Sequence, residues 1–150
     1  NLVYLSPLEI IQVINLTSGD IMGVPLYCQI FLILFGGFFA FQLTFNSQKF
    51  AESNRMDSPQ AGFAFKPAGF LMFGFVLMLI ATLPMLQIGG FSSAKELVAG
   101  IGIFTLSAFI FNMGLVLKVW STFDGADHEP KNAIRPLIPL IAVIIYFVTS

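Results

Sequence analysis

Four long apolar stretches constrain the fold of this chain more than any other feature of its sequence. They run from Leu26 to Phe45, Gly69 to Ile88, Leu97 to Val119 and Ala133 to Ser150. A helix needs about 20 mostly apolar residues to cross the hydrocarbon core of a membrane. The first three stretches have that length, and the fourth reaches it only when it starts near Ala133. The sequence therefore predicts an all-α membrane protein with three to four transmembrane helices.

The amino-acid composition agrees with this prediction. Of the 150 residues, 57% are hydrophobic and 10% are charged, whereas about a quarter of the residues in an ordinary soluble domain are charged. Nearly every residue lies in an apolar stretch or beside one, so no room remains for a separate soluble domain. We expect residues 1–150 to form one membrane-embedded helical domain.

Lysine and arginine are distributed unevenly between the loops. One side of the predicted membrane holds a single basic residue, Lys95. The other side holds six: Lys49, Arg55, Lys66, Lys118, Lys131 and Arg135. Because basic residues in short loops favour the cytoplasmic side, we expect both termini outside the cytoplasm. An amino terminus there, in a chain that starts with Asn1, predicts removal of a signal peptide.

Capping patterns refine the ends of the predicted helices. Ser6-Pro7-Leu8-Glu9 forms a capping box that begins a short amphipathic helix ending near Thr17. This helix is expected either to lie in the membrane interface or to pack against a neighbouring subunit. Ser93-Ala94-Lys95-Glu96 is a second capping box, at the start of the third span. No strong helix breaker follows the first span before Asp57-Ser58-Pro59, so its helix is expected to continue to about Arg55.

Prolines and small residues inside the spans predict kinks and close helix contacts. Pro84 and Pro139 each remove a backbone hydrogen bond, so each is expected to kink its helix, as a hinge or as an ordinary tolerated bend. Small residues allow helices to approach closely in lipid, within one chain or between copies. The predicted small packing residues are Gly36, Ala40, Gly100, Gly102 and Ser107. Polar residues within the spans are expected to hydrogen-bond between helices, with Asn112 as the first candidate among Gln29, Gln42, Thr82, Thr105, Ser107 and Asn112.

Residue sets that membrane catalysis or ion coupling requires are missing. No ionisable side chain lies near the middle of a span, as a proton pump or ion-coupled transporter would need. The single histidine, His128, cannot supply the two axial ligands of a b-type haem. The loop from Asp124 to Glu129 gathers three carboxylates and an imidazole, but it lacks the spacing of an EF-hand. We therefore expect a solvated turn there, no metal, no cofactor other than bound phospholipid, and no enzymatic activity.

Several local patterns together resemble a known group of membrane proteins. They are the amphipathic amino-terminal helix, a first span that continues into a polar helix, a Lys66-Pro67-Ala68-Gly69 segment before a span ending Leu83-Pro84-Met85, and a third span ending Leu117-Lys118-Val119-Trp120. From about Pro25 to Arg135, this layout resembles the small membrane subunits of type IVB conjugation and secretion systems, of the TraQ and DotE/IcmC kind. A glycine-rich final span is usual in such relatives, whereas the last span here contains proline and little glycine.

The resemblance implies a structural role in a bacterial type IV conjugation or secretion apparatus. With its predicted orientation, the chain is also similar to conjugative pilins, which have both termini in the periplasm, wait in the inner membrane and then polymerise into an extracellular filament, often with phospholipid. The expected partners are copies of the chain itself, other conjugation or secretion subunits and membrane lipid. The net charge of −1 gives no basic field for non-specific nucleic-acid binding, so nucleic acid is expected only as transported cargo.

The same comparison with pilins implies where phospholipid or a filament lumen would be contacted. Lys49, Arg55 and Lys66 are the first candidates for these contacts, followed by Lys118, Lys131 and Arg135. The alternative function is a small non-catalytic accessory subunit of a multi-subunit energy-converting membrane complex. A small-molecule transporter is less well supported, because no span carries a coupling group and no repeat relates the two halves.

Overall fold

The computed structural model describes residues 23–54, 56, 59–91, 93–120 and 129–150. In chain order its helices are α2 (Val24–Phe45), α3 (Ser47–Ser53), α4 (Pro59–Ala81), the short 3-10 helix η2 (Ile88–Gly90), α5 (Lys95–Val116), α6 (Pro130–Ile134) and α7 (Leu137–Thr149). Among the described residues, four helical segments are long and apolar enough to cross a membrane, the last of them formed by α6 and α7 together. The predicted all-α membrane fold is therefore confirmed. The predicted amphipathic helix from Ser6 to Thr17 lies outside the described residues.

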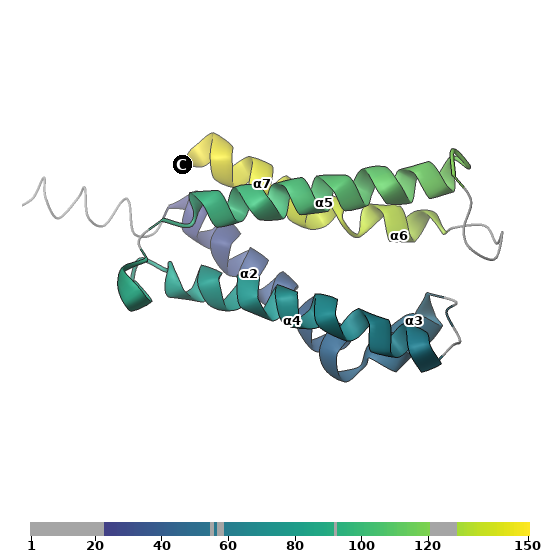
Figure 1. Ribbon diagram of the computed structural model, residues 1–150. Helices are drawn as coiled ribbons and strands as arrows, with labels where there is room; N and C mark the ends of the chain where they lie inside the picture. Colours follow the sequence, from purple (N-terminus) through teal and green to yellow (C-terminus); the bar gives the residue numbers. More distant parts are fainter. Residues whose placement is uncertain (1–22, 55, 57–58, 92, 121–128) are drawn as a thin grey trace, which may run out of the picture.

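The helices form an open bundle in which α2 is central (Figure 1). Helix α2 packs against α4 on one side and α7 on the other, and α5 packs against α6 and α7. Helices α4 and α5 hardly touch each other, so the bundle has an open seam between them.

The two ends of the bundle differ in charge and in packing. At one end, on the left of Figure 1, lie the start of α2, the end of α4, the start of α5 and the carboxyl terminus; we call this the terminal end. At the other end lie α3, the start of α4, the end of α5 and α6; we call this the basic end. Six cations are predicted on one side of the membrane, and the five of them that the structure describes all lie at the basic end. They are carried by α3, α6 and the neighbouring helix ends.

Glycines hold α4 directly against α2 and α3. A Cβ added at Gly69 would lie 2.9 Å from the backbone nitrogen of Thr44 and 3.0 Å from the carbonyl carbon of Leu43. A Cβ at Gly62 would lie 3.0 Å from the Cα of Gln48. Both positions meet backbone atoms as well as a side-chain oxygen of Gln48 or Thr44, and the backbone cannot move aside, so the helices can approach this closely only without side chains there.

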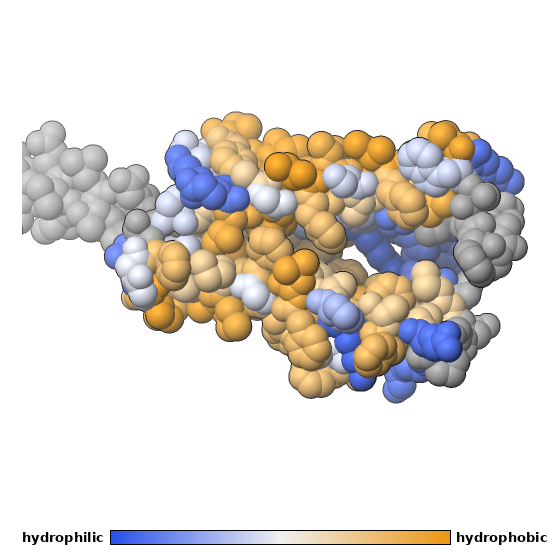
Figure 2. Space-filling model, in the orientation of Figure 1, coloured by the Kyte–Doolittle hydropathy of each residue, from blue (hydrophilic) through white to orange (hydrophobic). Residues whose placement is uncertain are grey.

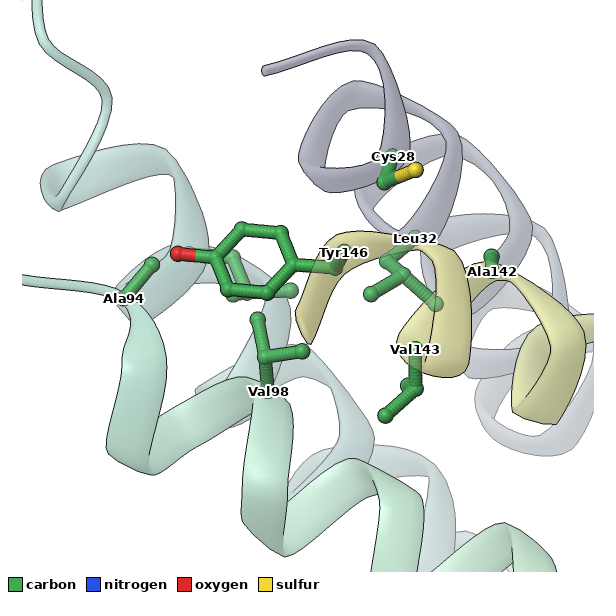
Figure 3. Close-up of a cluster of buried hydrophobic side chains, with 8 residues drawn as sticks. Cys28, Leu32, Ala94, Val98, Ala142, Val143 and Tyr146 are labelled. Carbon is green, nitrogen blue, oxygen red and sulfur yellow. The ribbon is translucent and has the colours of Figure 1, made fainter. Parts of the chain in front are cut away.

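The main hydrophobic core lies at the terminal end. Cys28 and Leu32 of α2, Leu79 of α4, Ala94 and Val98 of the α5 start, and Ala142, Val143 and Tyr146 of α7 form one buried cluster. Figure 3 shows the Tyr146 ring reaching from α7 toward Ala94 and Val98, with Leu32 and Val143 nearby. Side chains from all four spans therefore meet here and close this end of the bundle.

The first long helix continues beyond the membrane span, as the sequence predicts. Helices α2 and α3 are separated only at Asn46, which has φ −112° and ψ 26°. The backbone N–H of Asn46 still donates to Gln42, and the N–H of Phe50 donates to Asn46, at 3.1 and 2.9 Å. The helical path therefore runs from Val24 to Ser53 with one local distortion.

The second span differs from its prediction. Helix α4 begins at Pro59 and ends at Ala81, earlier at both ends than the predicted stretch from Gly69 to Ile88. The predicted kink at Pro84 is wrong, because Pro84 lies in the turn after α4 and bends no helix. A proline restricts the residue before it and lacks an N–H, so it favours a helix end as readily as a kink. The proline inside α4 is Pro67, which lies on its exposed side.

The fourth span is interrupted close to the predicted site. Arg135 and Pro136 form a turn between α6 and α7, and Pro139 lies in the first turn of α7. Pro139 has no N–H to donate to the carbonyl of Arg135, four residues earlier, and Pro136 has none to donate to Asn132. The interruption therefore falls one turn before Pro139, where the missing hydrogen bonds would have been.

Candidate functional site

A cleft of about 460 Å³ lies at the basic end of the bundle. Its lining residues are Phe38, Phe39, Gln42, Asn46, Lys49, Phe50, Ser53 and Arg135. Figure 2 shows a hollow between the half of the molecule built on α4 and the half built on α5, with hydrophilic surface inside it. The volume lies within the range of about 300–1,000 Å³ that is typical of small-molecule sites.

One continuous helix face forms most of the cleft wall. The positions of Phe39, Gln42, Asn46, Lys49 and Ser53 advance by three or four residues, so these side chains share one face of α2 and α3. This face is aromatic at the membrane-span end, carries neutral hydrogen-bonding groups in the middle, and becomes cationic in α3. Apart from Phe50, which lines the cleft beside Lys49, the wall thus changes from apolar to charged along the helix axis.

Arg135 lines the cleft from the other half of the molecule. It lies in the turn between α6 and α7, and its side chain is half-buried, whereas that of Lys49 is exposed. Within the part of the chain that the structure describes, neither cation forms an ion pair. Two positive charges that are distant in the sequence therefore line one cleft without an acidic side chain to neutralise them there.

The other predicted cations that the structure describes do not line this cleft. Lys66 is exposed on α4 and lies over the ring of Phe63, 5.9 Å from its centre. Lys131 forms an ion pair with Glu129. Lys118 follows the end of α5, and Arg55 lies outside the described residues.

Lys118 and Trp120 close the carboxyl end of α5. Lys118 has a left-handed φ of 57°, and the N–H groups of Lys118 and Val119 donate to Leu115 and Gly114 at 3.2 and 2.8 Å. This is the hydrogen-bond pattern of a Schellman motif, in which glycine usually holds the left-handed position. The chain then folds back, so that the Trp120 indole donates to the carbonyl of Phe111 at 3.0 Å and its ring covers Gly114.

The predicted packing residues separate into two groups. Ala40 is fully buried, and a Cβ at Gly36 or Gly102 would press on Val76 of α4 or Val143 of α7, at 3.1 or 2.9 Å. These three residues therefore do pack between helices. A Cβ at Gly100 would meet nothing within 4 Å, and Ser107 is exposed and donates to Ile103 of its own helix. The prediction is wrong for these two as contacts within the described chain, because they lie on the outer side of α5; contact between copies stays a prediction.

A predicted hydrogen bond between helices occurs at Gln29. The buried amide of Gln29 donates to the carbonyl of Leu79 at 2.8 Å and to the hydroxyl of Thr82 at 3.1 Å. The amide of Asn112 donates to Ala108 in its own helix, and Thr105 likewise donates within α5. Helical spacing does not decide which polar side chain faces a partner helix, so the sequence could not rank these residues.

The sequence contains a signal for some packing residues of α4 and some residues of the cleft that were not predicted. Gly62, Gly69 and Val76 recur every seven residues, which is the spacing of a helix face that stays against one partner. The cleft residues Gln42, Asn46 and Ser53 share the spacing of Lys49, which could have indicated a polar face continuous with the span. No comparable signal in the sequence associates Arg135 with this face.

The fold and the cleft define a small helical membrane protein with a two-cation cleft at one end. No group of three or more His, Cys, Asp and Glu side chains that could hold a metal ion occurs among the residues that the structure describes. What the cleft can do chemically is hold an anion beside aromatic surface. Comparisons with known protein families, with curated proteins and with solved structures give no match to this chain.

Proposed function

We propose that this chain is a structural subunit of a bacterial type IV conjugation or secretion apparatus, in a pilin-like form that polymerises with lipid into a conjugative filament. In this proposal it first resides in the inner membrane, with the basic end cytoplasmic and both termini periplasmic. Its partners are copies of itself, other subunits of the apparatus and membrane lipid, and nucleic acid passes only as cargo.

The open seam between α4 and α5 is the observation that carries the proposal. These two helices hardly contact each other. In the apolar segment of each helix, only 17% of the residues are buried inside the chain. Large apolar side chains on their outer faces include Phe70 and Leu77 of α4 and Ile103 and Phe104 of α5. Small and apolar helix faces of this kind pack on one another in lipid through close van der Waals contact. Copies of the chain would therefore meet through α4 of one subunit and α5 of the next.

An interface between two different faces links copies head to tail, into an open polymer or a ring, and not into a two-fold dimer. Cross-linking in the native membrane tests this. In a Cys28→Ala background, which removes the single natural cysteine, Leu77→Cys on α4 and Ile103→Cys on α5 are combined in one chain. Oxidation should give a ladder of covalent oligomers, and only the monomer should appear when Ile103→Cys is replaced by the buried control Val98→Cys.

Composition of purified filaments provides the direct test. Sheared conjugative filaments should contain this chain in many identical copies related by a helical operator. Filaments without the chain would contradict the pilin-like form. One copy beside unlike membrane chains in a purified complex would instead support the accessory subunit of an energy-converting complex.

A further inference from the structure

We propose that the cleft at the basic end binds one anionic phospholipid, with its phosphate between Lys49 and Arg135 and its acyl chains beside Phe38 and Phe39. This site belongs to the single chain, so it requires neither polymerisation nor the membership of a secretion apparatus proposed above.

The charge of the cleft selects an anion. Lys49 and Arg135 are its charged lining residues, and both are cationic. Neither has an ion-pair partner within the described part of the chain. Arginine matches the geometry of a phosphate with its planar fork of N–H donors, and lysine adds a mobile point charge. Gln42, Asn46 and Ser53 can donate further hydrogen bonds to ester or phosphate oxygens.

The order of residues along the wall selects an amphiphile rather than a free ion. Phe38 and Phe39 lie in the span, Gln42 and Asn46 at its end, and Lys49, Phe50 and Ser53 in the extension beyond it, where Phe50 is the one aromatic member. From Phe38 to Ser53 the helix rises about 22 Å, at 1.5 Å per residue. Half of a bilayer with its headgroups is about 20–22 Å thick. The wall therefore presents apolar, polar and cationic groups over the length on which one phospholipid presents acyl chains, esters and phosphate.

A lipid can reach this cleft from within the membrane. The hollow opens between the α4 and α5 halves, at the seam where helices α4 and α5 hardly contact each other (Figure 2). Helix α4 packs closely on α3 at Gly62 and on α2 at Gly69, so this side offers no opening. The open seam gives acyl chains a continuous path between the bilayer and the aromatic part of the wall.

Native mass spectrometry of the full chain in detergent tests the proposal. The purified chain is titrated with phosphatidylglycerol and, separately, with phosphatidylcholine of the same acyl chains. One molecule of phosphatidylglycerol should bind about tenfold more tightly than phosphatidylcholine. Millimolar inorganic phosphate should not displace it, because free phosphate makes no use of the aromatic wall.

Variants in the cleft and outside it separate a specific site from general attraction to a basic surface. Lys49→Gln and Arg135→Gln should each weaken phosphatidylglycerol binding about tenfold. Lys66→Gln, at the same end of the bundle but outside the cleft, should change it less than about twofold on the same scale. Arg135→Lys keeps the positive charge but loses the planar fork, so it should weaken binding less than Arg135→Gln does, which separates loss of charge from damage to the α6–α7 turn.

Three results would overturn the proposal. One is equal affinity of the wild-type chain for the two lipids, which needs no variant and is independent of any folding defect. Another is a loss of binding in Lys66→Gln as large as in Lys49→Gln. The third is displacement by inorganic phosphate, which would assign the cations to a free anion instead of a lipid. Because binding is measured on single chains, failure of this test leaves the filament and cross-linking tests unaffected.

Discussion

The terminal end and the basic end of the bundle are built from the same helices but differ in how those helices meet. At the terminal end, Leu79 and Val98 are 1% and 0% exposed, and side chains from all four spans surround them. At the basic end, α4 packs against α3 at Gly62, and α6 packs against α5 on the other side of the cleft. The four spans converge at one end and separate into two pairs at the other. The difference indicates that stability is concentrated at the terminal end and ligand access at the basic end.

The largest expected effect comes from breaking the α2–α4 pair that defines one side of the cleft. Gly69→Ala should lower the free energy of unfolding by about 3 kcal/mol, because its Cβ meets the backbone of Leu43 and Thr44 in addition to the Thr44 hydroxyl, and the backbone cannot move aside. Equilibrium unfolding in mixed detergent micelles measures this change.

Gly74→Ala, in the same helix, is the matched control. A Cβ at Gly74 meets nothing within 4 Å, so this substitution should be neutral or should stabilise by up to about 1 kcal/mol. Equal destabilisation by the two substitutions would show that the glycine contact does not hold the pair together.

The next largest effect tests the closed terminal end. Leu79→Ala should destabilise by about 2 kcal/mol, because it leaves a cavity among α2, α5 and α7. Leu77→Ala, two residues earlier and 62% exposed, should change stability by less than about 0.5 kcal/mol. Similar losses in both variants would contradict a stability concentrated at this end.

A smaller effect is expected for the polar contact that joins α2 to the end of α4. Gln29→Leu removes the donor to Leu79 and Thr82 and should destabilise by about 1 kcal/mol, the usual scale for hydrogen bonds between membrane helices. A double-mutant cycle with Thr82→Val measures the Gln29–Thr82 part of this energy. Strict additivity would mean that this hydroxyl contact does not couple the helices.

The smallest effect has the opposite sign and concerns the basic end. Lys118→Gly should stabilise by about 0.5–1 kcal/mol, because glycine holds the left-handed φ of 57° without the cost that a side chain incurs. Lys66→Gly, inside α4, should destabilise by about 1 kcal/mol. Thermal unfolding of the two variants compares the same substitution in two backbone conformations.

Local patterns in the sequence predict much of the fold. The apolar stretches, the extension of the first helix beyond Phe45 and the approximate start of α5 follow from local patterns. The capping box predicted at Ser93 is wrong in its detail, because the N-cap of α5 is Ala94 and the Ser93 hydroxyl accepts from the Lys95 N–H instead. The main error concerns α4, where Pro59 begins the helix and Pro84 lies beyond it. Hydropathy set the predicted span there, but the polar first turns of α4 belong to the same helix because they pack on α3.

Local patterns predict less of the cleft. Lys49 and Arg135 were candidates among six cations, and nothing in their spacing distinguishes them from Lys66 or Lys131. Arg55 cannot be compared with them, since it lies outside the described residues.

The sequence by itself determined that the chain has helices able to span a membrane and that its cations gather at one end, because hydropathy and loop charge are properties of short segments. Only the tertiary structure decided that α2 is central, that the seam between α4 and α5 is open, and that Lys49 and Arg135 line one cleft. These features depend on which helix faces meet and where the helices diverge. Contacts such as Gly69 on Thr44 decide that in three dimensions, and no periodicity within a single helix records it.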